Sequence, residues 1–326
     1  MRVLITGGTG FLGSHVVRGL LARGDEVRAL VRPGRPTTLV DLPGVEIARG
    51  HLLDEASLLK ACHGMQGVIH CAVHAGFWRR QDDIQRRVIA DGTSALLRAA
   101  RAANVSRIVH VSSIATIGVT RDGQALDEQA PWHGRTLGMG YVGAKREAED
   151  RALAAARDGI PVVVICPGGM MGPRLDGSPL SWHLRRWTDG SAGWAPQGGT
   201  SIGDVEDVAA GALSALDRGR VGERYIMAGH NLTWRELHLA VARHAGKTPR
   251  VRLIPGAVRN ALWARAKALD LVGLSRPPYT PEFFALWGWF AYMDSGKAKR
   301  ELGYRIRPLE ETLSRYRWDA VATQRV

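Results

Sequence analysis

The sequence predicts an α/β fold in which a doubly wound, parallel β-sheet is followed by a smaller domain. Three observations predict it. Short apolar runs alternate with helical patterns through the first half of the chain, which is typical of parallel βαβ units. A glycine-rich turn separates the first apolar run from the first helical pattern. After Pro167 the pattern changes, because Gly, Pro, Ser and Trp crowd residues 168–203.

The strands of the sheet are expected where β-branched and other apolar residues form short runs between turn residues. These runs are residues 3–6, 27–31, 45–47, 67–72, 107–112 and 161–165. The helices are expected where apolar residues recur with helical spacing or strong helix formers are concentrated. The first runs from the glycine-rich turn to about residue 22, and Gly24 ends it. Two more are expected over residues 91–103 and 141–157. A fourth starts at residues 204–208 and continues through residues 209–216.

This order of elements divides the chain into two domains. The sheet domain comprises residues 1–167 and about 201–223, and the smaller domain comprises residues 168–200 and 224–326. Doubly wound sheets bind their ligands beyond the carboxyl ends of the strands. We therefore expect the functional site at that edge of the sheet, with the smaller domain supplying the substrate contacts.

The composition excludes several classes of protein. With 45% apolar residues, the 326-residue chain can bury a core and is not intrinsically disordered. Its cysteines, Cys62, Cys71 and Cys166, are too few and odd in number for a secreted disulfide scaffold. No apolar run is long enough for a membrane-spanning helix, and the N-terminus lacks a cleavable signal pattern. These observations predict a soluble cytoplasmic protein.

The chain is basic, with 44 Lys and Arg against 31 Asp and Glu, and most of the excess lies in residues 224–326. Such a segment can attract an anionic substrate, a membrane surface or nucleic acid, but it is equally often a solvated face. No groove-reading motif supports nucleic-acid binding. The eleven His have no Cys or carboxylate partners at metal-ligand spacing. We expect neither nucleic acid nor a metal ion.

A dinucleotide-binding turn is indicated by Thr6-Gly7-Gly8-Thr9-Gly10-Phe11-Leu12-Gly13, which lies between a strand and a helix. Gly7 permits the tight turn, Gly10 lets the backbone approach a pyrophosphate, and Gly13 lets the helix pack closely on the strand. The pyrophosphate would lie at the N-terminus of the helix, where free N–H groups and the helix dipole favour an anion.

The end of the second strand indicates which dinucleotide binds. A site for NAD places a carboxylate there for the ribose 2′-hydroxyl, whereas a 2′-phosphate requires Arg. Here that position is Val31, followed by Arg32, with Arg35 close behind. No carboxylate repels the phosphate and a guanidinium can hold it, so we expect NADP(H).

A candidate catalytic pair is formed by Tyr141 and Lys145, which are four residues apart and share one face of a helix. The fifth strand ends in Ser112 and Ser113, at the edge where ligands bind. A free tyrosine titrates near pH 10, and a neighbouring ammonium lowers that pKa, so that the phenol can act as acid or base. A serine hydroxyl can hydrogen bond to the substrate oxygen and orient its carbonyl group.

Together with the glycine-rich turn, these residues resemble the extended short-chain dehydrogenase/reductase family, which is also described as the NAD(P)-dependent epimerase/dehydratase family. Residues 204–209 and 294–304 extend the resemblance over nearly the whole chain. The most similar branch contains the dihydroflavonol-reductase-like proteins and the hopanoid-associated sugar epimerases. The resemblance implies a Rossmann-type sheet and a homodimer that uses the helix bearing Tyr141.

The resemblance also implies roles for individual residues. Ser113 is favoured over Ser112 as the catalytic serine, because it lies five residues before Gly118. Lys145 would hold the nicotinamide ribose as well as act on Tyr141. The implied cofactor contacts are Gly7, Thr9, Gly10, Phe11, Leu12, Arg32, Leu52, Ala72, Val73, Tyr141, Lys145, Pro167 and Gly168.

Two departures concern the adenine. The position after Gly50 usually holds Asp in the family and is His51 here, and the Asn expected before Gly92 is replaced within residues 88–90. Adenine contacts through backbone groups are therefore expected, and His51 is a doubtful ligand.

Further departures bear on the reaction. The Asp-Glu pair of the family's 4,6-dehydratases is replaced by Ile114-Ala115. The Asn and Arg with which nucleotide-sugar epimerases hold a diphosphate are replaced by Gly169 and Thr200. These changes favour an oxidoreductase that interconverts a ketone and a secondary alcohol, with a sugar epimerase as the alternative. A non-catalytic dinucleotide sensor is disfavoured, because such relatives usually lose the Tyr or the Lys.

An apolar or aromatic small molecule is the expected substrate. Thioether and aromatic side chains that suit it are Met170, Met171, Phe77, Trp78, Trp132 and Trp182. The same residue types also form ordinary cores. His74 is a further candidate for a substrate contact. Residues 257–293 combine basic and aromatic side chains, which fits a peripheral membrane contact, a hydrophobic lid over the substrate or a subunit contact.

Overall fold

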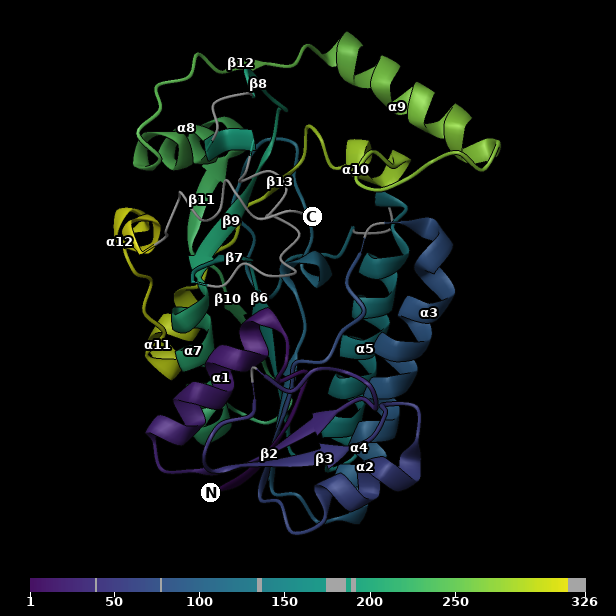
Figure 1. Ribbon diagram of the computed structural model, residues 1–326, viewed down its shortest axis with the longest axis vertical. Helices are drawn as coiled ribbons and strands as arrows, with labels where there is room; N and C mark the ends of the chain where they lie inside the picture. Colours follow the sequence, from purple (N-terminus) through teal and green to yellow (C-terminus); the bar gives the residue numbers. More distant parts are fainter. Residues whose placement is uncertain (39, 77, 134–136, 174–185, 189–191, 316–326) are drawn as a thin grey trace.

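The structure is a computed structural model that describes residues 1–38, 40–76, 78–133, 137–173, 186–188 and 192–315. Its lower part in Figure 1 is a parallel sheet with helices on both faces, and its upper part is a smaller set of strands and helices. No helix of these residues is both long and apolar enough to cross a membrane.

The large sheet has seven strands, and every neighbouring pair is parallel. The strands in spatial order are β10 (Arg224–Met227), β6 (Val162–Pro167), β5 (Arg107–Val111), β4 (Gly67–His70), β1 (Arg2–Thr6), β2 (Glu26–Val31) and β3 (Val45–Arg49). The chain order reverses beside β1, between β4 and β2, so the crevice of a doubly wound sheet opens at the carboxyl end of β1.

Two layers of helices cover this sheet, one on each face (Figure 1). One layer contains α1 (Phe11–Ala22), α7 (Val205–Arg218) and α11 (Gly296–Leu302). The other contains α2 (Glu55–Cys62), α4 (Gly92–Ala102) and α5 (Gly140–Arg157), with α3 (Asp82–Arg86) beside α5. Burial of both faces explains why the strands are nearly continuous apolar runs. The fold class expected from the sequence is confirmed.

The smaller part is built around a second sheet. Its strands are β7 (Gly169–Met171), β9 (Gly199–Asp204), β11 (His230–Thr233) and β13 (Phe290–Ala291), and a separate pair is formed by β8 (Trp194–Ala195) and β12 (Arg252–Leu253). The helices around it are α8 (Trp234–His244), α9 (Gly256–Leu271), α10 (Pro281–Ala285) and α12 (Leu309–Ser314). Short helical turns occur at η1 (Arg79–Gln81), η2 (Arg87–Asp91) and η3 (Ile114–Thr116).

The sheets divide the chain differently from the expected domain boundaries at two points. Residues 224–227 form β10, which pairs with β6 at the edge of the large sheet, although the smaller domain was expected to include them. The cause is burial, since Tyr225, Ile226 and Met227 are fully buried. Conversely, β9 belongs to the second sheet, although its last residues were expected in the first domain.

Candidate active site

The glycine-rich turn has the geometry that a bound pyrophosphate requires. Gly7 has a φ of 73°, and a Cβ there would lie 2.6 Å from the backbone N of Ala72. A Cβ on Gly13 would lie 2.1 Å from the carbonyl oxygen of Gly7. Gly10 is the N-cap of α1 and supplies no side-chain cap, and the first turn of the helix contains no acidic residue. The turn is therefore a cradle that fits the diphosphate of a dinucleotide.

The other predicted cofactor contacts surround the same edge of the sheet. Ala72 and Val73 follow β4, Pro167 ends β6, and Gly168 comes next. Leu52 is buried against the backbone of Gly92. Thr9, Phe11 and Leu12 belong to the turn and the first turn of α1. His51 accepts a hydrogen bond at Nδ1 from the backbone N of Leu53, 3.1 Å away, which gives its ring a structural role in this loop.

Arginines gather where β2 and β3 end. Arg32 and Arg35 are exposed in the turn after β2. Arg49, at the end of β3, donates from Nη1 to the carbonyl oxygens of Arg32 and Arg35, at 3.4 and 3.2 Å, and so fixes the turn. Within the described part of the chain, the Arg32 guanidinium has neither a hydrogen bond nor an ion pair. Sequence reasoning missed Arg49, because its role depends on the pairing of β2 with β3.

Ser113, Tyr141 and Lys145 converge beside the carboxyl end of β5. Tyr141 and Ser113 are joined by a side-chain hydrogen bond. Lys145 is buried and donates from Nζ to the carbonyl oxygen of Val111, 2.9 Å away. The two serines differ in their partners, because Ser112 is buried and donates to Glu149 instead. Ser113 is thus the serine that contacts the phenol.

The pKa of Tyr141 departs from the sequence-based expectation. Burial raises it to about 12, partly offset by the hydrogen bond with Ser113. Burial also lowers the pKa of Lys145 to about 8, against the opposing effects of Cys71, Cys166 and Glu149. The expected lowering of the tyrosine pKa by Lys145 is therefore wrong for this structure: desolvation dominates and the ammonium is bonded to a backbone carbonyl. At neutral pH the phenol keeps its proton.

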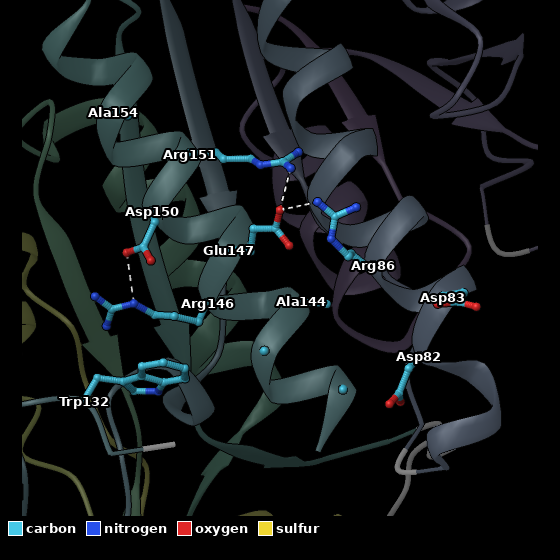
Figure 2. Close-up of a pocket in the computed structure, with 12 residues that line it drawn as sticks. Asp82, Asp83, Arg86, Trp132, Ala144, Arg146, Glu147, Asp150, Arg151 and Ala154 are labelled. Atoms are coloured by element: carbon cyan, nitrogen blue, oxygen red, sulfur yellow. Dashed lines mark hydrogen bonds and ion pairs between the residues drawn. The ribbon is translucent and has the colours of Figure 1, made fainter. Parts of the chain in front are cut away.

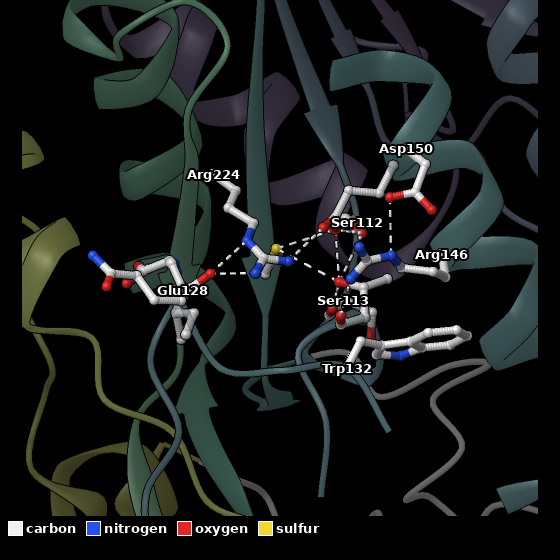
Figure 3. Close-up of polar contacts among 12 residues, drawn as sticks. Ser112, Ser113, Glu128, Trp132, Arg146, Asp150 and Arg224 are labelled. Atoms are coloured by element: carbon white, nitrogen blue, oxygen red, sulfur yellow. Dashed lines mark hydrogen bonds and ion pairs between the residues drawn. The ribbon is translucent and has the colours of Figure 1, made fainter. Parts of the chain in front are cut away.

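The buried carboxylate of Glu149, one helical turn beyond Lys145, holds the segments around the site together. Glu149 Oε2 accepts hydrogen bonds from Ser112 and Thr116, both at 2.6 Å, and Oε1 pairs with Arg224 Nη1 at 3.0 Å. Arg224 also donates from Nε to the backbone oxygen of Glu128 at 2.9 Å (Figure 3). Glu149 thereby ties α5 to the residue that follows β5, to η3 and to β10. Glu149 was not predicted from the sequence, although its spacing from Lys145 places it on the same helix face.

Two histidines lie beneath Lys145 in the sheet. His70 is buried between Thr6 and Thr93, with ring-nitrogen to hydroxyl distances of 2.6 and 3.1 Å. His110 is buried beside it, with ring centroids 5.4 Å apart, and neither of its ring nitrogens has a partner among the described residues. Burial, then the charge of Lys145, lowers the pKa of His70 to about 3, and burial, then His70 and Lys145, lowers the pKa of His110 well below 6.5.

We expect the protein to lose stability as the pH falls below about 6.5. The unfolded chain then binds protons at these histidines while the native state keeps them neutral, which lowers the free energy of unfolding by up to about 1.4 kcal/mol per pH unit for each. The loss continues until the pH reaches the native pKa, which is about 3 for His70. Urea unfolding at pH 7.5 and pH 5 measures the effect.

The variant His110→Phe isolates one contribution, because it removes a titrating ring that makes no hydrogen bond among the described residues. We expect a smaller pH dependence for it than for the unchanged protein. His63→Gln, at an exposed position, is the matched control and leaves the pH dependence unchanged. A urea midpoint that is the same at both pH values would contradict the prediction.

An apolar cluster borders the phenol of Tyr141. Leu137, Met139 and Val142 form its buried centre. The side chains of Ala115, Val119, Trp132, Tyr141, Leu286 and Trp289 pack against that centre. Leu286 and Trp289, which lie between α10 and β13, thus pack in the same cluster as the catalytic Tyr141.

The predicted substrate contacts have different surroundings. Trp132 lies in this cluster and donates from Nε1 to the backbone oxygen of Ala115 at 3.4 Å. Met171 is fully buried in the core of the smaller part, and Met170 packs against the core of the large sheet, so both have core contacts. His74 and Trp78 are half-buried after β4. Phe77 and Trp182 lie outside the described residues.

The described residues contain no group of three or more His, Cys, Asp or Glu side chains that could hold a metal ion. The chemistry of the site depends on the phenol of Tyr141, the hydroxyl of Ser113, the ammonium of Lys145 and the glycine-rich phosphate cradle. A phenol that keeps its proton at neutral pH can donate it to an oxygen, and a neighbouring hydroxyl can fix the position of that oxygen.

Comparison with known proteins agrees with this geometry. The sequence model of the NAD dependent epimerase/dehydratase family matches residues 3–228. A putative dihydroflavonol 4-reductase from Synechocystis is 32% identical over 317 residues, which cover 95% of this chain and 92% of that protein. A 4-hydroxy-2-methyl-3-oxo-4-farnesyl-3,4-dihydroquinoline-1-oxide ketoreductase from Stigmatella aurantiaca is 31% identical, covering 94% and 92%. The crystal structure of gox2253 is similar with a TM-score of 0.85 at 30% identity, covering 96% of each chain.

Proposed function

The chain belongs to the NAD dependent epimerase/dehydratase family, and we propose that it is an NADP(H)-dependent oxidoreductase that interconverts a ketone and a secondary alcohol on an apolar or aromatic small molecule. The observation that carries the proposal is the contact between Ser113 and Tyr141 at the border of an apolar cluster. The family binds nicotinamide dinucleotides, and the glycine cradle fits such a cofactor.

The residues have separate tasks in the reduction of a ketone. When bound, the reduced nicotinamide supplies a hydride for the carbonyl carbon. Ser113 hydrogen bonds to the carbonyl oxygen and Tyr141 donates its proton to that oxygen, which yields the alcohol. Lys145, which is fixed beside the site by its hydrogen bond to the carbonyl oxygen of Val111, would hold the ribose of the bound cofactor. The apolar cluster excludes water from the reacting carbon.

Reduction is favoured over the other reactions of the family. Ile114 and Ala115 occupy the positions of the dehydratase acid and base, and both are apolar. The names of both relatives described above state a reductase or a ketoreductase, and one of these names includes a farnesyl group. A sugar epimerase is the second candidate, because the family includes epimerases by name.

The test is a screen of ketones and secondary alcohols that follows NADPH absorbance, with apolar ring ketones and nucleotide sugars in parallel. Oxidation of NADPH by an apolar ketone supports the proposal. Inversion at a C–H centre of a nucleotide sugar without net redox change would overturn it in favour of the epimerase.

Specificity for NADP(H) is expected to depend on Arg32. The variant Arg32→Ser removes the guanidinium that would pair with the 2′-phosphate, so we expect NADPH to bind about 10- to 100-fold more weakly while NADH binding stays within about twofold. Arg101→Ser, at an exposed position on α4, is the matched control. Fluorescence titration with both cofactors measures the ratio. An unchanged preference, or equal binding of NADH and NADPH by the original protein, would contradict the assignment.

The protein is further proposed to act as a homodimer through the outer side of α5. A groove of about 710 Å³ lies there, lined by Trp132 and by residues of α3 and α5. In Figure 2, Glu147 lies between Arg86 and Arg151, at 2.7 and 2.5 Å, so both signs of charge are present for a self-complementary contact. Gly143 opens into free space.

The dimer is tested by Gly143→Arg, because a Cβ at Gly143 would meet no other part of the chain within 4 Å and the longer side chain would block a second copy. Light scattering after gel filtration is expected to report a dimer for the original protein and a monomer for the variant. Gly256→Arg, at another glycine with open space, is the control and leaves the dimer intact. A monomeric original protein would overturn this proposal.

A further inference from the structure

Helix α9 presents an apolar face to solvent. The residues of this face recur with helical spacing and all are exposed: Ala257, Ala261, Ala264, Ala268, Leu271 and Val272. Ala266, on the opposite side, is the buried residue of the helix. Helical spacing of apolar residues ordinarily marks the side that packs on a core, yet here that side points away from the protein.

Among the described residues, the most exposed large apolar side chains lie where α9 ends. Leu271, Val272 and Leu274 are 85%, 68% and 63% exposed. They occupy one turn, which continues through Gly273 into Ser275. We call the face of α9 together with Leu274 the α9 surface. These three branched side chains are exposed to solvent at the end of one helix. An exposed apolar patch of this kind often marks an interaction site.

The contacts of α9 with the rest of the protein leave this surface uncovered. The helix packs chiefly against α10 and lies at the upper edge of the molecule (Figure 1). Arg259 donates from Nη1 to the backbone oxygen of Trp287 at 3.2 Å, and Asp270 pairs with Arg79 at 3.1 Å. Both contacts lie on the inner side of the helix, so they fix its position without burying the α9 surface.

The charges beside the α9 surface are positive. Arg265 and Lys267 are exposed on its two flanks, and Arg276 follows its tip. Arg80 approaches the same tip, because a Cβ on Gly273 would lie 3.4 Å from its Nη2. The acidic residue of α9, Asp270, is already paired with Arg79. A partner that complements this surface therefore has an apolar region to contact the aliphatic side chains and negatively charged groups around that region to pair with the cations.

We propose that the α9 surface docks on a lipid bilayer that contains anionic headgroups. The aliphatic side chains would enter the boundary of the acyl chains and the flanking cations would lie among the headgroups, as in an interfacial amphipathic helix. Trp263, which carries Lys267 over its ring at 4.6 Å, and the exposed Tyr279 have the amphipathic character suited to that depth. A second copy fits less well, because pairing two α9 surfaces would set Arg265 and Lys267 against like charges.

Docking would bring the active site close to the bilayer. The chain passes from α9 through α10 to Leu286 and Trp289, which pack in the apolar cluster beside Tyr141. The docking itself does not depend on the reaction, and its test measures binding alone.

The experiment is co-sedimentation of the full chain with vesicles of phosphatidylcholine and phosphatidylglycerol at low salt. We expect binding to these vesicles, and at least about tenfold weaker binding to phosphatidylcholine alone or at high salt. The double variant Leu271→Glu/Leu274→Glu is expected to weaken binding about tenfold or more, since it removes apolar contact and adds negative charge. Leu59→Glu/Val221→Glu, at exposed apolar positions on α2 and after α7, is the matched control and binds normally.

Charge reversal tests the flanks in the same way. Arg265→Glu/Lys267→Glu is expected to abolish binding, whereas Lys60→Glu/Arg101→Glu makes the same change in net charge elsewhere and is expected to bind better than the first. Brominated lipids should quench tryptophan fluorescence, and Trp263→Phe should remove most of that quenching. Absence of binding at low salt, or equal loss in both charge-reversal variants, would overturn the proposal. The proposal would also be overturned if the protein formed an oligomer without lipid and the double variant Leu271→Glu/Leu274→Glu dissociated that oligomer.

Discussion

Replacement of Tyr141 by Phe is expected to reduce turnover about 10²- to 10⁴-fold, the contribution typical of a positioned general acid. The variant keeps the ring that packs in the apolar cluster and removes the hydroxyl that bonds to Ser113. Its fold and its binding of NADPH should therefore change little. Steady-state kinetics on a ketone found by the screen, together with fluorescence titration of the cofactor, measure the two effects separately.

The control for this variant is Tyr279→Phe, at an exposed tyrosine of the same chain. It is expected to retain full turnover. Substantial turnover by Tyr141→Phe would remove the phenol from the mechanism, and loss of cofactor binding along with turnover would indicate a structural role instead.

Most of the large sheet was predictable because its signals are local. The strands β1, β4, β5 and β6 are short, mainly apolar runs, and α1 and α5 were expected to within a residue or two of their bounds. Strand β10 was not recognised as part of this sheet, since its pairing with β6 joins distant parts of the chain. Helix α2 was also missed, although Asp54 caps it by accepting from the backbone N of Ser57.

The candidate site was predictable where its residues share one turn or one helix face. The glycine-rich turn and the pair Tyr141–Lys145 are of this kind. The pKa of Tyr141 was not, because burial results from packing by segments far apart in the sequence. The same limit applies to the α9 surface: the sequence showed mixed apolar and basic residues, but only the structure shows that the apolar side is the one left uncovered.

Removal of the Glu149 carboxylate is expected to have the largest effect on stability. Its side chain is fully buried, and it pairs with Arg224 while accepting from Ser112 and Thr116. In Glu149→Leu the guanidinium of Arg224 loses its buried counter-charge and two hydroxyls lose their acceptor. Breaking one side of a buried ion pair costs about 3–5 kcal/mol, and we expect a loss of that size in the free energy of unfolding from urea titration.

A double-mutant cycle distinguishes the pair from a general intolerance of substitution. Glu149→Leu/Arg224→Met replaces both charges by apolar groups, so it should cost less than the sum of the two single variants, because no buried charge is left without a partner. Arg98→Ala breaks the exposed pair with Glu55 and should cost less than about 1 kcal/mol. Additive losses in the cycle would show that the ion pair is not what holds α5 to β10. Glu149→Gln keeps an oxygen that can accept from Ser112 and Thr116 but sets an amide NH2 group against the Arg224 guanidinium, so it should be more stable than Glu149→Leu and less stable than the unchanged protein.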